Sequence, residues 1–252
     1  MKPTFLKYDR PILTVMLQCE TPETAIGRIR NANCLGGEAF GLQVECLKPE
    51  YRTPETYKRI FGEMQGKPSY VTYYRGNHNT GKTDDALADG LITIAESGAT
   101  LCDVIGDLFD RQPDEVARDP KAIEKQMKLI DKLHEKGAEV LMSSHICKFT
   151  PAERVLEVAF EQKRRGADII KIVVSANSME EQIENLRINQ LLSTELGAPF
   201  LFLSGGVSSI HRRLGIKLGC CMSLCLYEHD HLSTPPQPLL SIEKTIRDDL
   251  GF

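Results

Sequence analysis

Short apolar runs alternate with segments of helical periodicity along the whole chain. The runs have the length and continuous apolar character of strands that are buried on both faces, and the segments between them repeat apolar residues every three to four positions. This pattern predicts strands at residues 11–17, 39–45, 69–74, 100–105, 138–144, 168–174, 198–204 and 219–226. Helices are expected between the strands, for example over residues 120–136 and 152–165.

Capping signals support the predicted helix boundaries. Three Thr-Pro pairs combine a capping hydroxyl with a proline at the first helical position. They are Thr21-Pro22, Thr53-Pro54 and Thr150-Pro151. Gly137 and Gly166 stand where two helices are expected to end before a new strand begins.

Eight strand–helix units fill the 252 residues without a proline- or glycine-rich linker, so a single domain over residues 1–252 is expected. Alternating strands and helices favour a parallel sheet covered by helices, and eight units over this length favour a closed sheet. The predicted fold is therefore α/β, a single (β/α)8 TIM barrel. An open doubly wound sheet is the alternative, but no Gly-rich turn follows the first predicted strand.

Charge and composition exclude several kinds of partner. The formal net charge of −4 leaves no basic footprint, so no nucleic acid partner is expected. No apolar stretch approaches the length of a membrane span, and the first residues lack the pattern of a signal peptide, so a cytoplasmic protein without membrane contact is expected. The eight cysteines form no C-x-x-C pair and several lie in apolar runs, which predicts reduced thiols and no metal site.

Lys171 lies at the centre of the apolar run DIIKIVV at residues 168–174. Alternation along a strand places Ile169, Lys171 and Val173 on one face. Because burial favours the neutral amine, a lysine in such a run is suited to attack a carbonyl and form a Schiff base. The alternative is a structural lysine that extends to solvent at the strand end or pairs with a carboxylate such as Asp168.

Other polar side chains follow the predicted strands, at the barrel edge where (β/α)8 enzymes carry their chemistry. His145 ends the fifth strand, next to the strand of the buried lysine, where a histidine can remove a proton beside an iminium. The alternative is a hydrogen-bonded structural histidine. Glu45 and Arg75 suit substrate hydroxyls or a carboxylate, or else each belongs to an ion pair at the barrel mouth. Arg212 and the segment STPPQ (233–237) offer donors that suit a carboxylate.

Over nearly its whole length the chain resembles the type I 3-dehydroquinate dehydratases, (β/α)8 Schiff-base enzymes of the shikimate and quinate pathways. The resemblance is strongest in four segments, which are SSHICKFTP (143–151), GADIIKI (166–172), HRRLGIKLGC (211–220) and STPPQPLLSI (233–242). It implies that Lys171 forms the iminium and that His145 acts as general base and acid. It also implies catalysis without a metal or organic cofactor, and a homodimer.

The resemblance also assigns the substrate contacts. The implied substrate is 3-dehydroquinate, a small carboxylated ketone. The positions that match the family's carboxylate-binding residues are Arg212, Ser233 and Gln237. Glu45 matches the glutamate that holds the ring hydroxyls, and Arg75 matches the arginine of the third strand.

Several positions depart from the family pattern. They are Leu47, Asn79, Ile105 and His211, in place of an arginine, two glutamates and a serine. Lys48 or Arg52 is a candidate replacement for the lost arginine. Asn79 stands where the family has the glutamate that orients the catalytic histidine, and with Ser143 it is expected in the shell behind the catalytic pair. The residues that would contact the ring hydroxyls of the substrate have changed, so we expect a divergent member of the family with a different substrate or a different rate of turnover.

Two other functions compete with this interpretation. A Schiff-base aldolase for phosphorylated sugars also uses a lysine on the sixth strand, and LSGGVSS at residues 203–209 resembles its phosphate loop. Deoxyribose-phosphate aldolases carry a second lysine where this chain has Phe202. The third interpretation is a barrel that binds a carboxylate without turnover. The altered hydroxyl-reading residues favour it, and the retention of Lys171 and His145 disfavours it.

Overall fold

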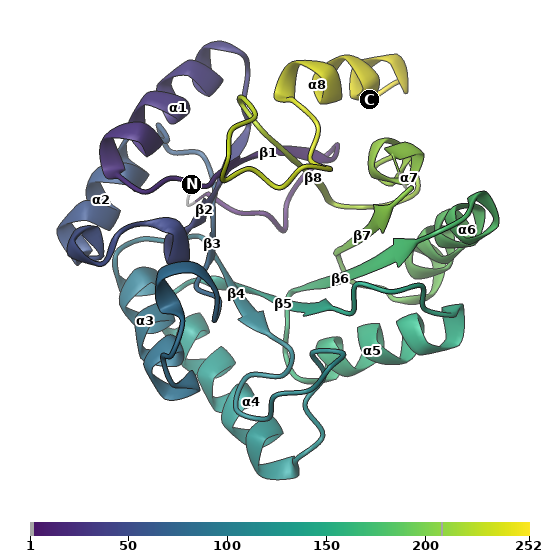
Figure 1. Cartoon of the computed structure of the whole chain (residues 1–252), viewed down its shortest axis with the longest axis horizontal. Coiled ribbons are helices and arrows are strands. Elements are labelled where there is room, and N and C mark those ends of the chain that lie inside the picture. Colours follow the sequence, from purple (N-terminus) through teal and green to yellow (C-terminus); the bar gives the residue numbers. More distant parts are fainter. Residues whose placement is uncertain (1–2, 208) are drawn as a thin grey trace.

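Each predicted apolar run contains a strand in the computed structural model, which describes residues 3–207 and 209–252. The strands are β1 (Ile12–Leu17), β2 (Ala39–Gln43), β3 (Ser69–Thr72), β4 (Leu101–Ile105), β5 (Glu139–His145), β6 (Ile169–Ala176), β7 (Phe200–Gly206) and β8 (Met222–Cys225). They pair in parallel in the order β7-β6-β5-β4-β3-β2-β1-β8, and the Cys221 N–H at the start of β8 donates to the Phe200 carbonyl of β7 at 2.9 Å. The sheet is a nearly closed barrel, which confirms the predicted fold (Figure 1).

Helices surround the barrel on the outside (Figure 1). Those in the described part of the chain are α1 (Pro22–Cys34), α2 (Pro54–Gly62), α3 (Asp84–Glu96), α4 (Pro120–Glu135), α5 (Ala152–Arg164), α6 (Met179–Glu195), α7 (Ser209–Leu214) and α8 (Leu240–Asp249). Short 3-10 helices after β2 and β3 are η1 (Val44–Cys46), η2 (Pro49–Tyr51) and η3 (Asn77–Asn79). None of the described helices combines the length and the apolar character that crossing a bilayer requires.

The helix boundaries follow local capping chemistry. The Thr21 and Thr53 hydroxyls accept hydrogen bonds from the first turns of α1 and α2, as predicted. The prediction for Thr150 is wrong, because Pro151 is extended, with φ −60° and ψ 155°, and α5 begins only after it. The Thr150 hydroxyl donates to the Lys148 carbonyl instead of capping the helix.

The strand register decides which side chains fill the barrel. Lys171 on β6 is level with Ser143 on β5 and with Leu201 on β7. Level partners in a parallel ladder point to the same side, so alternate residues of each strand enter the lumen. The lower lumen is apolar, and its side chains include Met16, Leu101, Leu141, Ile169 and Met222. Polar side chains begin above this layer, toward the carboxyl ends of the strands.

Two features keep the lower lumen tightly filled. Phe5 is fully buried, and its N–H donates to the Glu139 carboxylate at the start of β5 at 2.8 Å, so the amino-terminal segment covers this end of the barrel. Gly41 on β2 is level with Tyr70, and a Cβ at Gly41 would lie 2.2 Å from the Met16 sulfur and 3.1 Å from the Tyr70 ring. The missing side chain therefore makes room chiefly for the Met16 side chain, and also for the Tyr70 ring, inside the barrel.

Arg165, buried directly after α5, anchors the long connection between β4 and α4. Its guanidinium donates to the carbonyls of Gly106 and Ala117 at 2.9 and 2.8 Å, and to the Gln126 side chain at 2.8 Å. The Ala117 N–H in turn donates to the Gly106 carbonyl, at 2.9 Å. Both ends of the connection are thereby fixed to the barrel wall.

We expect Arg165→Met to lower the free energy of unfolding by about 3 kcal/mol, because it removes several buried hydrogen bonds from a charged donor. Urea unfolding followed by circular dichroism measures this change. Arg164→Met is the matched control, since Arg164 is exposed and pairs with the same Glu161; its effect should stay within about 0.5 kcal/mol. Equal effects of the two substitutions would contradict the anchoring role.

Candidate active site

The amine of Lys171 lies in the upper lumen, enclosed by two phenols and a carboxylate. Only 4% of the residue is exposed. Nζ lies 2.9 Å from the hydroxyls of both Tyr70 and Tyr74, and 3.2 Å from a carboxylate oxygen of Asp103. Asp168 is not its partner, because that carboxylate accepts from the Val140 N–H at 2.8 Å. The buried lysine is thus ion-paired inside the barrel, with the carboxylate of β4.

Asp103 is the centre of this cluster. One of its oxygens accepts hydrogen bonds from Tyr70, Tyr74 and Lys171, and the other accepts from the Ser143 hydroxyl at 2.5 Å. A buried ion pair is stable only when its remaining hydrogen-bonding capacity is used in this way. Burial and the neighbouring Asp103 hold the pKa of both tyrosines well above the ordinary value, so the two phenols stay protonated.

Glu45 lies on η1 beside this cluster and is fully buried. Both of its oxygens accept from the Thr72 hydroxyl at 3.0 Å, and one accepts from the Tyr74 N–H at 3.4 Å. Burial raises the pKa of Glu45 to about 7, with a smaller contribution from the negative charge of Asp103. A carboxyl group with this pKa changes its protonation state near neutral pH.

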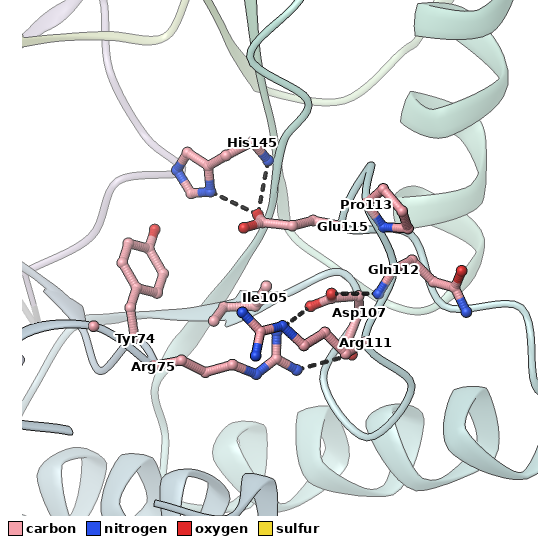
Figure 2. A pocket seen from close by; sticks show the side chains of 10 residues that line it. Tyr74, Arg75, Ile105, Asp107, Arg111, Gln112, Pro113, Glu115 and His145 are labelled. Atoms are coloured by element: carbon pink, nitrogen blue, oxygen red, sulfur yellow. Dashed lines mark hydrogen bonds and ion pairs between the residues drawn. The ribbon is translucent and has the colours of Figure 1, made fainter. Parts of the chain in front are cut away.

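His145 ends β5 two residues beyond Ser143, so its Cα lies about 7 Å further along the strand. The Glu115 carboxylate accepts from the His145 N–H at 2.8 Å and lies 2.7 Å from Nδ1 (Figure 2). This partner favours the proton on Nδ1, which leaves Nε2 as the free base. The Tyr74 ring meets the imidazole edge to face, with 5.3 Å between the ring centroids.

Glu115 is held in an unusual backbone conformation to reach the histidine. Its φ is +49°, a region that few residues other than glycine occupy. The Ser144 hydroxyl donates to its carbonyl at 2.8 Å. A Cβ at Gly106 would lie 2.5 Å from the same carbonyl, so the connection approaches β4 closely only because that residue is glycine. The wall of the barrel therefore positions the carboxylate beside His145.

A cavity of about 530 Å³ opens beside the histidine, at the carboxyl ends of β3, β4 and β5. The side chains that line it, shown in Figure 2, include Tyr74, Arg75, Asp107, Arg111, Glu115 and His145. Lys171 is not among the lining residues, and its amine contacts the hydroxyl of Tyr74, which does line the cavity. The cavity thus borders the histidine directly, and Tyr74 connects its wall with the lysine amine.

Arg75 lines this cavity but is strongly paired with the protein itself. Its guanidinium binds the Asp84 carboxylate at 2.8 and 2.9 Å and the Asp107 carboxylate at 2.6 Å, and it donates to the Asp107 carbonyl at 3.0 Å. These partners raise the pKa of Arg75 above the ordinary value. Four of its five N–H donors are engaged by these contacts, so one is left within the described residues.

Asn79 does not contact His145, contrary to the expectation from the sequence. Its amide donates to the Tyr74 carbonyl at 2.8 Å, and its oxygen accepts from Arg52 at 2.6 Å. The orienting carboxylate comes instead from Glu115, one strand further round the barrel in the connection after β4. Arg52 does not fill the gap at Leu47 either, because its guanidinium donates to the Leu47 carbonyl at 2.6 and 2.8 Å.

Arg212, Ser233 and Gln237 make no hydrogen bond to one another among the described residues. Arg212 donates to the Ser204 carbonyl at 3.2 Å, and burial lowers its pKa to about 10. The Ser233 hydroxyl donates to Asp230 at 2.8 Å. Gln237 is buried, and its side-chain oxygen has no partner in the part of the chain that the structure describes. None of the three lines the cavity beside His145.

Four residues of the site, Tyr70, Tyr74, Asp103 and Glu115, are not among the site residues predicted from the sequence. The tyrosines do carry a signal, because residues 70, 72 and 74 follow the alternation that turns Lys171 into the lumen. Glu115 carries none, since it lies in an irregular connection where no periodicity applies. The cysteines form no disulfide within the described residues, which also contain no group of three or more side chains able to hold a metal ion.

Comparison with known proteins gives one family and a set of solved structures. The sequence profile described as type I 3-dehydroquinase matches residues 13–241. No curated protein sequence matches the chain. A 3-dehydroquinate dehydratase from Geobacillus kaustophilus has a TM-score of 0.82 at 16% identity, covering 96% of this chain and 91% of its own.

Two other solved structures are similarly close. A type I 3-dehydroquinate dehydratase from Clostridium difficile with covalently modified comenic acid has a TM-score of 0.81 at 16% identity, covering 97% of this chain and 94% of its own. The enzyme from Enterococcus faecalis has a TM-score of 0.79 at 14% identity and covers 98% of each chain. At these identities the structural likeness establishes the fold.

The raised pKa of Glu45 predicts a pH-dependent stability. The folded protein keeps a proton on Glu45 that the unfolded chain loses above its ordinary pKa of 4.5. The stabilisation that comes from this tighter proton binding is therefore fully present at low pH and is lost as the pH rises toward about 7. Glu45→Gln mimics the protonated form. In the wild type, the free energy of unfolding should fall between about pH 5 and pH 8. We expect this fall to be smaller in Glu45→Gln, by up to about 3 kcal/mol.

Urea unfolding at the two pH values measures this difference. Glu50→Gln is the control, because Glu50 is exposed and its removal should leave the pH dependence of the wild type unchanged. A Glu45→Gln variant with the same pH dependence as the wild type would show that Glu45 ionises normally in the folded protein.

Proposed function

The chain belongs to the type I 3-dehydroquinase family, and on this premise we propose that Lys171 and His145 dehydrate 3-dehydroquinate to 3-dehydroshikimate through a Schiff base. Enzymes of this family are hydro-lyases that use a covalent lysine Schiff base and need no cofactor. The observation that supports the assignment most strongly is the position of Lys171. Its amine lies inside the barrel beside a carboxylate that can accept its proton, one layer below a histidine with a free Nε2.

The first step joins lysine and substrate. Asp103 takes a proton from the ammonium of Lys171, and the neutral amine attacks the ketone carbon. The resulting carbinolamine loses its hydroxyl as water and becomes an iminium cation. The cation stays within the field of the Asp103 carboxylate, which compensates its charge in the buried site. The iminium acts as an electron sink and acidifies the neighbouring C–H bond.

His145 performs the elimination. Its Nε2 removes the acidified proton, and Glu115 stabilises the imidazolium that forms. The electron pair of the broken C–H bond forms an enamine, which expels the β-hydroxyl and regenerates the iminium. The imidazolium returns its proton to the leaving hydroxyl, so water departs. Hydrolysis of the iminium then releases 3-dehydroshikimate and restores Lys171.

The remaining sequence-predicted residues bind the substrate in this proposal. Arg212, a half-buried cation, pairs with the ring carboxylate, and Ser233 and Gln237 add hydrogen bonds from the loop after β8. Ser233 has to exchange its bond to Asp230 for one to the substrate. Glu45 and the remaining N–H of Arg75 hold ring hydroxyls. Because these contacts place the reacting carbon near His145, they act by positioning.

We further propose that the enzyme works as a homodimer in the cytoplasm, as its family resemblance implies. The product serves either aromatic amino acid biosynthesis or quinate breakdown. Sedimentation of the purified 28.2 kDa chain tests the assembly.

An aldolase function is less well supported. Position 202, where deoxyribose-phosphate aldolases carry a second lysine, lies on the outer face of β7, where Phe202 packs against His211 with ring centroids 5.3 Å apart. The lumen positions on either side are Leu201 and Leu203. The phosphate-loop segment 203–209 includes Ser208, which lies outside the described residues. A barrel that only binds a carboxylate remains the alternative if no turnover occurs.

Borohydride reduction in the presence of 3-dehydroquinate tests the function. We expect a covalent adduct on the peptide that contains Lys171, located by mass spectrometry, and neither adduct nor turnover in Lys171→Met. In His145→Gln the adduct should still form, while kcat falls by about 1000-fold, because only the proton transfers are impaired. Turnover without an adduct, or an adduct on another lysine, would rule out the proposed mechanism.

A further inference from the structure

Two phenols contact the amine of Lys171 at the same distance of 2.9 Å, but their surroundings differ. Tyr70 is fully buried and is not among the residues that line the cavity. Tyr74 is half-buried, lines the cavity and lies against the edge of the His145 ring (Figure 2). Of the groups that contact the lysine amine, Tyr74 is therefore the one that faces the substrate space.

Two hydrogen bonds of the Tyr74 hydroxyl run in one direction. The Lys171 ammonium donates to its hydroxyl oxygen, and the hydroxyl donates to the Asp103 carboxylate. Such a chain moves a proton from lysine to aspartate when the phenol oxygen takes one proton and gives up another. The high pKa of Tyr74 favours this transfer, because a phenol that stays protonated can relay a proton without becoming an anion.

We propose that Tyr74 is a further catalytic residue, which relays protons between the buried Asp103–Lys171 pair and the carbonyl oxygen of a substrate in the cavity. This inference rests on the proposed Schiff-base function. Tyr74 links the buried ion pair to the cavity, which Asp103 cannot do because its side chain is fully buried and does not line the cavity. Tyr74 contacts Asp103 through its hydroxyl and is itself one of the residues that line the cavity.

The proton balance follows from this arrangement. Before attack, the ammonium proton passes from Lys171 to Asp103, directly or through Tyr74, which leaves a neutral amine and a neutral carboxyl. The amine forms a bond to the ketone carbon, and the nitrogen proton shifts to the oxygen to give the carbinolamine. Tyr74 then gives its proton to the carbinolamine hydroxyl and is reprotonated by Asp103. Water leaves, and the products are the iminium cation and the Asp103 carboxylate.

The relay predicts that Tyr74→Phe forms the adduct slowly but completely. The protein is mixed with 3-dehydroquinate and quenched with borohydride after increasing times, and mass spectrometry follows the modified Lys171 peptide. We expect the rate of adduct formation to fall by about 100-fold, as for loss of a general acid, while the final yield stays near that of the wild type. Near-ultraviolet circular dichroism reports whether the variant is folded.

Two other tyrosines supply matched controls. Tyr70→Phe removes an equivalent pair of hydrogen bonds to Lys171 and Asp103 without changing the cavity wall, so its effect on the rate should be much smaller. Tyr73→Phe changes the adjacent residue, whose hydroxyl accepts from Lys82 at 2.5 Å, and should leave the rate unchanged. Equal losses in Tyr70→Phe and Tyr74→Phe would overturn the relay, since they would indicate only a shared support of Asp103. A wild-type rate in Tyr74→Phe would overturn it as well.

A failure of the proposed Schiff-base function can be told apart from a failure of the relay, because in the first case the wild type itself would form no adduct. If Tyr74→Phe does not fold, 3,5-difluorotyrosine introduced at position 74 keeps the ring and the hydroxyl but makes the phenol more acidic. The relay predicts a changed rate of adduct formation in that protein, and an unchanged rate overturns the relay.

Discussion

The ion pair between Asp103 and Lys171 is the interaction on which the site depends. Two opposite charges removed from water are stable only if their partners are all in place, and here two phenols and a serine hydroxyl complete the carboxylate's hydrogen bonds. This requirement explains why the upper lumen is polar on β3, β4, β5 and β6 together. The Asp103 carboxylate also accepts the lysine proton, so side chains of the chain itself suffice for the chemistry of a Schiff base.

The fold places this pair by register and by close packing. Gly41 leaves space for the Tyr70 ring, and Gly106 lets the connection after β4 approach the barrel, so that Glu115 reaches His145. Arg165 fixes both ends of that connection from the outside. The result is a base and a nucleophile on neighbouring strands, at successive layers of the same lumen wall. The contacts that stabilise the connection after β4 therefore also hold Glu115 beside His145.

Periodicity predicts eight strand–helix units, because buried parallel strands and amphipathic helices leave clear patterns, and their number over this length favours a barrel over an open sheet. Alternation also places Lys171 on the same strand face as Ile169 and Val173, but the direction of that face follows only from the folded barrel. Contacts between distant segments leave no such pattern. Asn79 was the expected partner of the histidine by position, yet it binds Arg52, and Glu115 takes that place from an irregular connection. The ion pair of Arg75 with Asp84 and Asp107 is likewise a consequence of three-dimensional proximity, which the sequence does not encode locally.

The extent of adduct formation in Asp103→Asn tests the central role of the ion pair most directly. Without the carboxylate, the iminium cation is left uncompensated in the buried site, which costs several kcal/mol. Borohydride trapping at saturating 3-dehydroquinate should then modify a fraction of Lys171 at least about tenfold smaller than in the wild type. Near-ultraviolet circular dichroism serves to establish that the variant is folded. A folded Asp103→Asn protein with the wild-type yield of adduct would contradict the account.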